Sequence, residues 1–160
     1  MQKKHSNMAG MSENHYRHLL IMTVLSFVSM YILMYAMVNS IGNVFNNLNE
    51  FYMAGLMTAP MVLIELFVMR AMYQDSRRNA LIIGASIVAG LLFFMLIRQQ
   101  MAISDRQFLR SMIPHHAGAI LMCEWAPIQD VEIQNLCKSI IGSQQKEINQ
   151  LKAILKRLQE

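Results

Sequence analysis

The sequence predicts an all-α fold in which three transmembrane helices precede a two-helix hairpin outside the membrane. The chain is 54% hydrophobic and only 15% charged, whereas soluble domains average about 25% charged residues. Its apolar residues are gathered into three blocks, each close to the roughly 20 residues that an apolar helix needs to cross a bilayer. Residues 99–160 show a different pattern, the heptad-like spacing of paired helices.

The first predicted elements are an arm and a span. Residues 1–18 are polar and basic, and we expect a short disordered arm. Residues 19–38 carry no charge and match one bilayer span. This stretch exceeds the roughly 7–15-residue apolar core of a signal peptide, and a poor cleavage site follows it. We therefore expect an uncleaved helix.

The second span is predicted at residues 54–72 and the third at residues 80–98. Pro60 and a charged residue, Glu65, interrupt the second span, and Arg70 lies near its end. Small residues four apart allow close helix packing in lipid. The third span has two such pairs: Ser86 with Gly90, and Ala85 with Ala89.

Positive charges in the short flanking segments predict the orientation. The arm has three Lys or Arg residues before the first span, the loop at 39–53 has none, and residues 70–78 contain three Arg. Cytoplasmic flanks carry the excess of Lys and Arg, so the N-terminus is expected inside and residue 99 onward outside. The predicted domains are a cytoplasmic arm (1–18), a membrane domain (19–98) and an extracytoplasmic hairpin (99–160). In a bacterium these would lie in and around the inner (plasma) membrane, with the hairpin periplasmic or extracellular.

The hairpin is predicted from capping signals. Ser104 or Asp105 is a plausible N-cap for a helix that runs to about Trp125. Asp130 is the expected N-cap of a second helix that runs nearly to the end of the chain. Pro114 either kinks the first helix by removing a backbone hydrogen bond or marks its true start.

Both hairpin helices carry apolar stripes whose residues are alternately three and four apart. The first helix has two: a first seam (Phe108, Met112, His115, Ala119, Met122) and a second seam (Leu109, Ile113, His116, Ile120, Cys123). The last helix has one, with polar residues at Gln144 and Glu147: Ile133, Cys137, Ile140, Gln144, Glu147, Leu151, Ile154, Leu158. We therefore expect both histidines on the apolar face of the first helix.

Folding the hairpin about Asp130 brings the polar and sulfur-bearing residues of the two helices to matching heights. One predicted layer holds Cys123, Cys137 and Met122, and a deeper one holds Met112, His115, His116, Gln144 and Glu147. Buried carboxylates and imidazoles are costly without partners, and either mutual hydrogen bonds or a bound metal would remove this cost. We predict a metal site with these residues as ligands and Gln144 in a supporting position.

The donor types in these layers suggest the metal. Imidazole with thioether favours copper, Cu(I) above all, with silver as a mimic, whereas imidazole with carboxylate alone would favour iron or zinc. Three interpretations of the cysteines stay open: a disulfide, a soft-metal pair, or two buried thiols.

An ionisable residue inside the second span, Glu65, is a functional hypothesis by default. Met57 and Met61 precede it at steps of four along one helix face. Glu65 could be protonated, pair with a tyrosine of the first span (Tyr31 or Tyr35) or with Arg70, or lie on a soft-metal path lined by thioethers. Ordinary helix packing is the alternative explanation of the methionines.

The hairpin sequence "DRQFLRSMIPHHAGAILMC" followed by "IIGSQQKEINQL" resembles a bacterial His-His motif helical-bundle family, known as the three-hundred-and-fifth domain of unknown function. The resemblance covers about residues 104–155, and the three-span front resembles a membrane-anchored branch. It implies a ferritin-like bundle and copper binding or tolerance through the matching Met and His positions. The matching positions are Asp105, Phe108, Met112, His115, His116, Ala119, Met122, Gln144, Glu147 and Ile148. Leu151 replaces an expected methionine, and the cysteines are not part of the pattern.

The leading hypothesis is therefore a membrane-anchored protein that binds copper and buffers it or hands it on, and not an enzyme. Two helices cannot bury a full core alone, so we expect homo-oligomers that complete a bundle through their hairpins. The expected partners are a metal ion, the lipid bilayer and further copies of the chain. No clustered basic stripe suggests nucleic acid. One alternative is a structural oligomerisation module. A less favoured one is a ferritin-like metal oxidase, which would need several carboxylates, whereas this hairpin has only one well-placed Glu.

Overall fold

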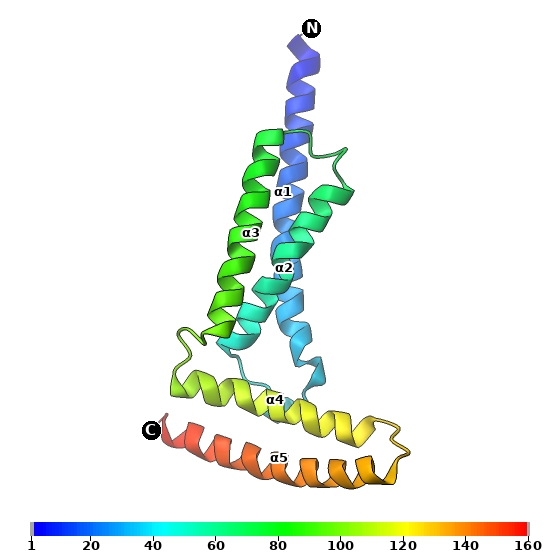
Figure 1. The fold of residues 1–160 in the computed structure, drawn as a ribbon. Helices are drawn as coiled ribbons and strands as arrows, with labels where there is room; N and C mark the ends of the chain where they lie inside the picture. Colours follow the sequence, from blue (N-terminus) through cyan, green and yellow to red (C-terminus); the bar gives the residue numbers. More distant parts are fainter. Residues whose placement is uncertain (1, 160) are drawn as a thin grey trace. The chain divides into compact units, whose positions relative to one another are not determined.

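The protein is described by a computed structural model that covers residues 2–159, with side chains from residue 14 onward. Within this range the chain forms helices and no strand (Figure 1). The α-helices are α1 (Gln2–Leu33), α2 (Leu48–Val68), α3 (Ser76–Arg98), α4 (Asp105–Trp125) and α5 (Val131–Arg157). Two short 3-10 helices, η1 (Met34–Met37) and η2 (Ile41–Asn43), follow α1. The predicted all-α class, with three long apolar helices before two others, is confirmed.

Three helical segments are long and apolar enough to cross a membrane: Asn14–Met37, Leu48–Val68 and Ser76–Arg98. In the most apolar stretch of each, 39% of residues are buried in α2 but only 6% in α1 and α3. The middle helix is thus the most enclosed by protein. The outer two expose most of their apolar side chains, as helices in contact with lipid do.

Three helices begin earlier than predicted. The arm is helical rather than disordered, since α1 begins at Gln2 and each further residue of an existing helix adds one hydrogen bond. The other two early starts are due to capping side chains. The second span begins at Leu48, six residues before its predicted start, because the Asn47 side chain accepts a bond from Glu50 N at 2.9 Å. Similarly, α3 begins at Ser76 because the Asp75 carboxylate accepts bonds from the next backbone N–H groups.

The chain divides into two compact units that do not follow the sequence order of the spans. The membrane unit comprises Met1–Tyr31 and Phe51–Gln99, and the hairpin unit comprises Ile32–Glu50 and Gln100–Glu160. The connection between α1 and α2 thus belongs with the hairpin, although it lies within the range 19–98 predicted as the membrane domain. Val38 and Phe45 of this connection pack against the hairpin core, which gives a polar loop an apolar anchor.

Small residues let the helices of the membrane unit approach closely. A Cβ atom added at Gly55 of α2 would lie 2.5 Å from the ring of Phe93, so only glycine leaves room for this aromatic side chain. A Cβ at Gly90 of α3 would lie 3.3 Å from the Ala59 side chain. Gly90 therefore faces α2, as expected for a small-residue pair that mediates helix packing.

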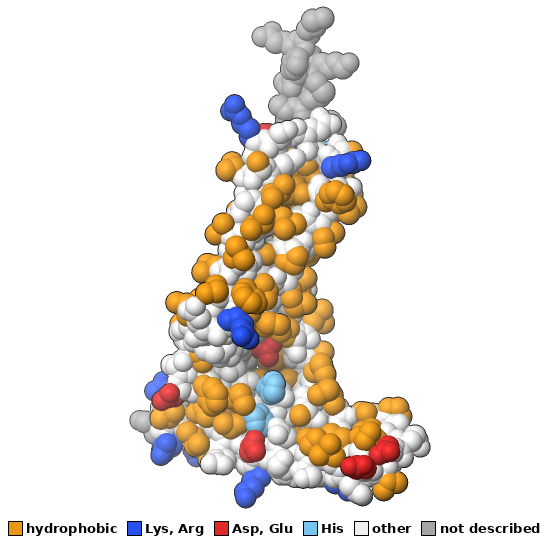
Figure 2. Space-filling view, viewed as in Figure 1, with side chains coloured by type: hydrophobic (Ala, Val, Ile, Leu, Met, Phe, Trp, Pro, Cys, Tyr) orange, Lys and Arg blue, Asp and Glu red, His pale blue; other side chains and the backbone are white. Residues whose placement is uncertain are grey.

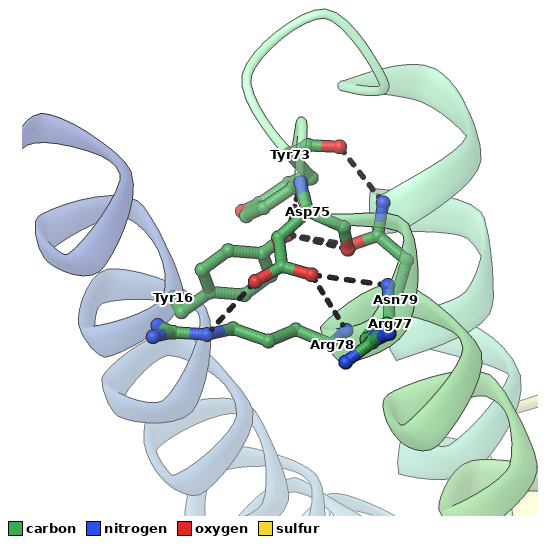
Figure 3. A network of polar contacts seen from close by, with 6 residues as sticks. All are labelled: Tyr16, Tyr73, Asp75, Arg77, Arg78 and Asn79. Atoms are coloured by element: carbon green, nitrogen blue, oxygen red, sulfur yellow. Dashed lines mark hydrogen bonds and ion pairs between the residues drawn. The ribbon is translucent and has the colours of Figure 1, made fainter. Parts of the chain in front are cut away.

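A polar network closes one end of the membrane unit, where α1 meets the start of α3 (Figure 3). The Tyr16 hydroxyl donates to Asn79 Oδ1 at 2.7 Å and accepts from Asp75 N at 3.2 Å. Asn79 Nδ2 in turn donates to the Tyr73 carbonyl at 2.8 Å. Arg78 pairs with Asp75 at 3.2 Å, and its guanidinium lies 5.5 Å from the centre of the Tyr16 ring. One tyrosine of α1 therefore ties together the whole α2–α3 turn.

We predict that Tyr16→Phe lowers the midpoint of thermal unfolding of the detergent-solubilised protein. The change keeps the ring beside Tyr73 and Arg78 but removes the hydroxyl that bonds Asn79 and Asp75. The loss of such a bond costs about 1 kcal/mol. Gln74→Ala, at an exposed position of the same turn, is the control and should change the midpoint little. An unchanged midpoint for Tyr16→Phe would contradict the structural role given to this hydroxyl.

Candidate functional site

The candidate site depends on how α4 and α5 pack side by side in the hairpin unit (Figure 1). The core contains three apolar residues of the second seam (Leu109, Ile113 and Ile120) and Ala117, all from α4. From α5 it contains Ile148 and Leu155, each of which follows a residue of the predicted stripe. Ile113 and Ile148 are completely buried, whereas the side chain of Glu147 is 50% exposed. The stripe of α5 thus lies at the edge of the interface, so a side chain there can touch both protein and solvent.

The α4 helix runs unbroken through Pro114. The alternative that this proline marks the helix start is therefore wrong, and Ser104 is the N-cap residue, as predicted. Proline lacks the N–H that would bond the carbonyl four residues earlier, which is that of Arg110. Pro114 is buried and immediately precedes the two histidines.

His116 is buried in the hairpin, and both of its ring nitrogens are hydrogen-bonded. Its Nδ1 lies 2.8 Å from the Met112 carbonyl and its Nε2 lies 2.6 Å from Glu147 Oε2. A carbonyl can only accept, so Nδ1 carries a proton and donates it. In the second hydrogen bond, the proton lies between Nε2 and the Glu147 carboxylate. The α5 partner of His116 is thus Glu147 rather than Gln144, the other α5 residue of the predicted deep layer.

His115 has a different environment, although it is the next residue. Successive helical residues are about 100° apart around the axis, and while His116 is only 7% exposed, His115 is exposed. The centres of the two rings are 6.0 Å apart. The expectation that both histidines lie on the buried face is therefore wrong for His115, because only the second seam faces α5. Met122 of the first seam is likewise 54% exposed.

Beside His116 lies a surface groove of about 260 Å³, lined by Phe108, Met112, His116, Glu147, Gln150, Leu151 and Ile154. It brings together three of the predicted ligands, one each with a thioether, an imidazole and a carboxylate. Gln144 and Met122 are not among the lining residues. Among the residues that the structure describes, no three His, Cys, Asp or Glu side chains are clustered closely enough to hold a metal ion. One chain therefore offers a partial ligand set.

Cys123 and Cys137 form a disulfide, with their Cα atoms 5.2 Å apart. This pair joins the ends of the helices next to the turn, at the matching height predicted from the sequence. Of the three interpretations of the cysteines, the structure shows the disulfide. The prediction that Cys123 and Cys137 are metal ligands is therefore wrong for this oxidised form, because disulfide sulfurs are not the thiolates that bind metals.

Glu65 of α2 accepts a hydrogen bond from the Tyr73 hydroxyl at 3.4 Å. The partner that the structure shows, Tyr73, is not among the residues proposed from the sequence (Tyr31, Tyr35 and Arg70). Burial, together with the adjacent Glu65 carboxylate, raises the pKa of Tyr73, so its hydroxyl remains a donor at neutral pH.

The two intramembrane methionines near Glu65 do not share one environment. Met57 is 47% exposed, whereas Met61 packs against the apolar cluster that contains Tyr73. This difference favours packing over a continuous path of thioethers.

We predict that replacing His116 destabilises the hairpin and that replacing His115 does not. His116→Ala removes both hydrogen bonds and leaves a cavity beside Ile113, which together cost about 2–4 kcal/mol. His115→Ala changes an exposed side chain and should stay within about 0.5 kcal/mol. Chemical denaturation followed by circular dichroism measures both, and equal losses would contradict the different burial of the two rings.

We also predict that the disulfide stabilises the hairpin by about 3 kcal/mol, the value for a closed loop of about 15 residues. Adding a reductant should lower the unfolding midpoint of the natural protein. The double variant Cys123→Ser/Cys137→Ser should start from that lower midpoint and show no response to reductant. A natural protein that is equally stable with and without reductant would contradict this prediction.

Comparison with known proteins places this hairpin in a family. Residues 95–155 match the domain of unknown function DUF305. An uncharacterized protein of Acanthamoeba polyphaga mimivirus, L153, is 38% identical over 140 residues, which are 86% of this chain and 90% of the relative. No solved structure matches the chain. The chain therefore belongs to the family of this mimivirus protein, and its hairpin carries the helical domain DUF305.

Proposed function

We propose that this chain is a membrane-anchored copper-binding protein that captures Cu(I), with Ag(I) as a mimic, and buffers it or transfers it. The observation that carries the proposal is the groove in which Met112, His116 and Glu147 meet. It places a soft thioether beside an imidazole on a rigid helix, and this donor pair suits Cu(I) better than hard cations. The match of residues 95–155 to the DUF305 domain supports the family resemblance, from which copper binding is an expectation.

Binding at His116 would begin by opening its bond to Glu147. The Glu147 side chain is 50% exposed, so it can rotate into water without leaving a buried charge. The proton between Nε2 and the carboxylate would leave to water with the Glu147 side chain, so that the Nε2 lone pair is free toward the groove that Met112 lines. The remaining bond from Nδ1 to the Met112 carbonyl would keep the ring oriented, as bonds from the second nitrogen commonly do for metal-binding histidines.

A second hairpin would complete the ligand set. Phe108 and Met122 of the first seam are 49% and 54% exposed, and His115 beside them is exposed too. Two helices bury little apolar surface, and pairing hairpins into a four-helix, ferritin-like bundle would cover this seam. We propose that copies of the chain associate in this way, which brings His115 and Met122 toward a shared site.

The membrane location in this proposal is the bacterial inner (plasma) membrane, with the N-terminus in the cytoplasm. Support comes from three helices of sufficient length and apolarity and from the clustering of Arg70, Arg77 and Arg78 between the second and third of them. An odd number of spans then puts the hairpin outside. Its disulfide fits such an oxidising compartment.

We predict that the intact protein in detergent binds Cu(I) or Ag(I) and that Met112→Leu weakens binding at least tenfold, because Leu keeps the volume but removes the thioether. His116→Ala should weaken it further. The matched controls are Met95→Leu and His18→Ala, both at exposed positions of the membrane unit. Competition with a chelator of known affinity measures binding. If Met112→Leu and His116→Ala bind as tightly as the natural protein, the copper proposal is lost.

A structural oligomerisation module is the second candidate, and one observation favours it. The bond from His116 to Glu147 and the bond to the Met112 carbonyl satisfy the buried imidazole without any metal. In that case the oligomer should persist after chelation and in the His115→Ala and Met112→Leu variants. Analytical ultracentrifugation of these samples distinguishes the two functions, because a metal-bridged assembly dissociates.

A further inference from the structure

The membrane unit contains an apolar groove of about 460 Å³ between its three helices. Its α3 wall contains Ala85 and Ala89 and its α2 wall contains Gly55 and Ala59, so small residues line it on two sides. Along α1 it extends from Tyr16 to Phe27. Close helix packing explains small residues where backbones touch, as at Gly90, but it does not explain a space left between them.

The groove is long and lined mainly by apolar side chains. Eleven residue steps from Tyr16 to Phe27 along α1 correspond to roughly 16 Å at about 1.5 Å per residue. An apolar groove of this length, open to the surroundings of the helices, suits an extended hydrocarbon chain.

One end of the groove is both polar and positively charged. Tyr16 lines the groove and also anchors the network at the α2–α3 turn (Figure 3). Arg78 lies over its ring and is paired with Asp75, while the exposed Arg77 side chain makes no ion pair among the described residues. Arg17 follows Tyr16 in α1 and is also exposed. Among the described side chains at this end, three arginines against one aspartate leave a net positive rim.

The apolar surroundings of the groove are those of a helix unit in lipid. On the face shown in Figure 2, hydrophobic side chains cover most of the three-helix unit, and Lys and Arg gather toward its ends. A ligand of the groove therefore needs a hydrocarbon part that lies along the apolar walls and an anionic part that meets the arginine rim.

We propose that this groove binds an acyl chain of an anionic membrane phospholipid, whose headgroup phosphate contacts the rim formed by Arg17, Arg77 and Arg78. Burial of the chain would stabilise the loosely packed α1 and α3, which expose most of their own apolar side chains. The inference rests on membrane insertion, one element of the proposed function, and is independent of copper binding.

The test uses the full chain in phosphatidylcholine vesicles, with a tryptophan reporter in the groove. The chain has a single tryptophan, so Trp125→Phe removes the background. Leu20→Trp adds the reporter at a groove residue that is 65% exposed and tolerates a larger ring. Phosphatidylglycerol or phosphatidylcholine with dibrominated acyl chains is then added in increasing fractions, because bromine quenches tryptophan fluorescence on contact.

The expected result is half-maximal quenching at a several-fold lower fraction of brominated phosphatidylglycerol than of brominated phosphatidylcholine. Ala85→Leu fills the groove and should remove this preference. Ala80→Leu, exposed on α3 and outside the groove, should keep it. Arg77→Gln changes an exposed side chain and should reduce the preference for phosphatidylglycerol without affecting folding. This second variant keeps the test valid if Ala85→Leu fails to fold.

Equal quenching by the two lipids would overturn the proposal, because it is the behaviour of bulk lipid around any apolar helix. Protection from both brominated lipids would also overturn it and would indicate that a protein surface covers the groove. Resistance of the vesicle-bound chain to alkaline extraction separates these outcomes from a failure of membrane insertion, which would defeat the anchoring proposal as well.

Discussion

The packing of α4 against α5 is the constraint on which the candidate site depends. A disulfide joins the helices near the turn, the Asp130 side chain starts α5 by accepting a bond from Ile133 N, and Ile113, Ile120 and Ile148 are completely buried between them. Together these features fix the register of the hairpin, that is, which residues of α4 and α5 lie opposite each other. In that register His116 reaches Glu147 at 2.6 Å, and a slip by one residue would turn the carboxylate away from the imidazole.

The same register explains why adjacent histidines have different properties. The helix places His116 among apolar side chains with both nitrogens bonded, while His115 is exposed. In the function that we propose, the buried, oriented imidazole binds the metal ion when the half-exposed Glu147 carboxylate moves away. An exposed imidazole on an apolar seam is suited to a site completed by another chain. A role for both residues in one metal site therefore implies association of hairpins.

The membrane unit is organised differently, by polar contacts at one end and small residues along its length. Tyr16, Asp75 and Asn79 hold the ends of the helices together, whereas Gly55, Ala59 and Ala89 leave a groove between them. Because hydrocarbon tails are as apolar as the side chains they meet, packing in lipid gains little from hydrophobic burial. The hydrogen bonds at the α2–α3 turn therefore do much to hold the three helices in place. Glu65 is linked to them through Tyr73.

The sequence by itself determined the helical class, the three apolar spans and the caps of the hairpin helices, because these depend on local composition and on residues close together in the chain. It also placed the two cysteines at one level, since that follows from the length of the turn. Only the tertiary structure decided which seam of α4 is buried, that Glu147 rather than Gln144 meets His116, and that Tyr73 is the partner of Glu65. Two seams of similar apolarity lie side by side on α4, and a shift of one turn in α5 changes every contact. Which seam of α4 is buried depends on how the side chains of both helices pack together. The spacing of residues along one helix carries no information about that packing.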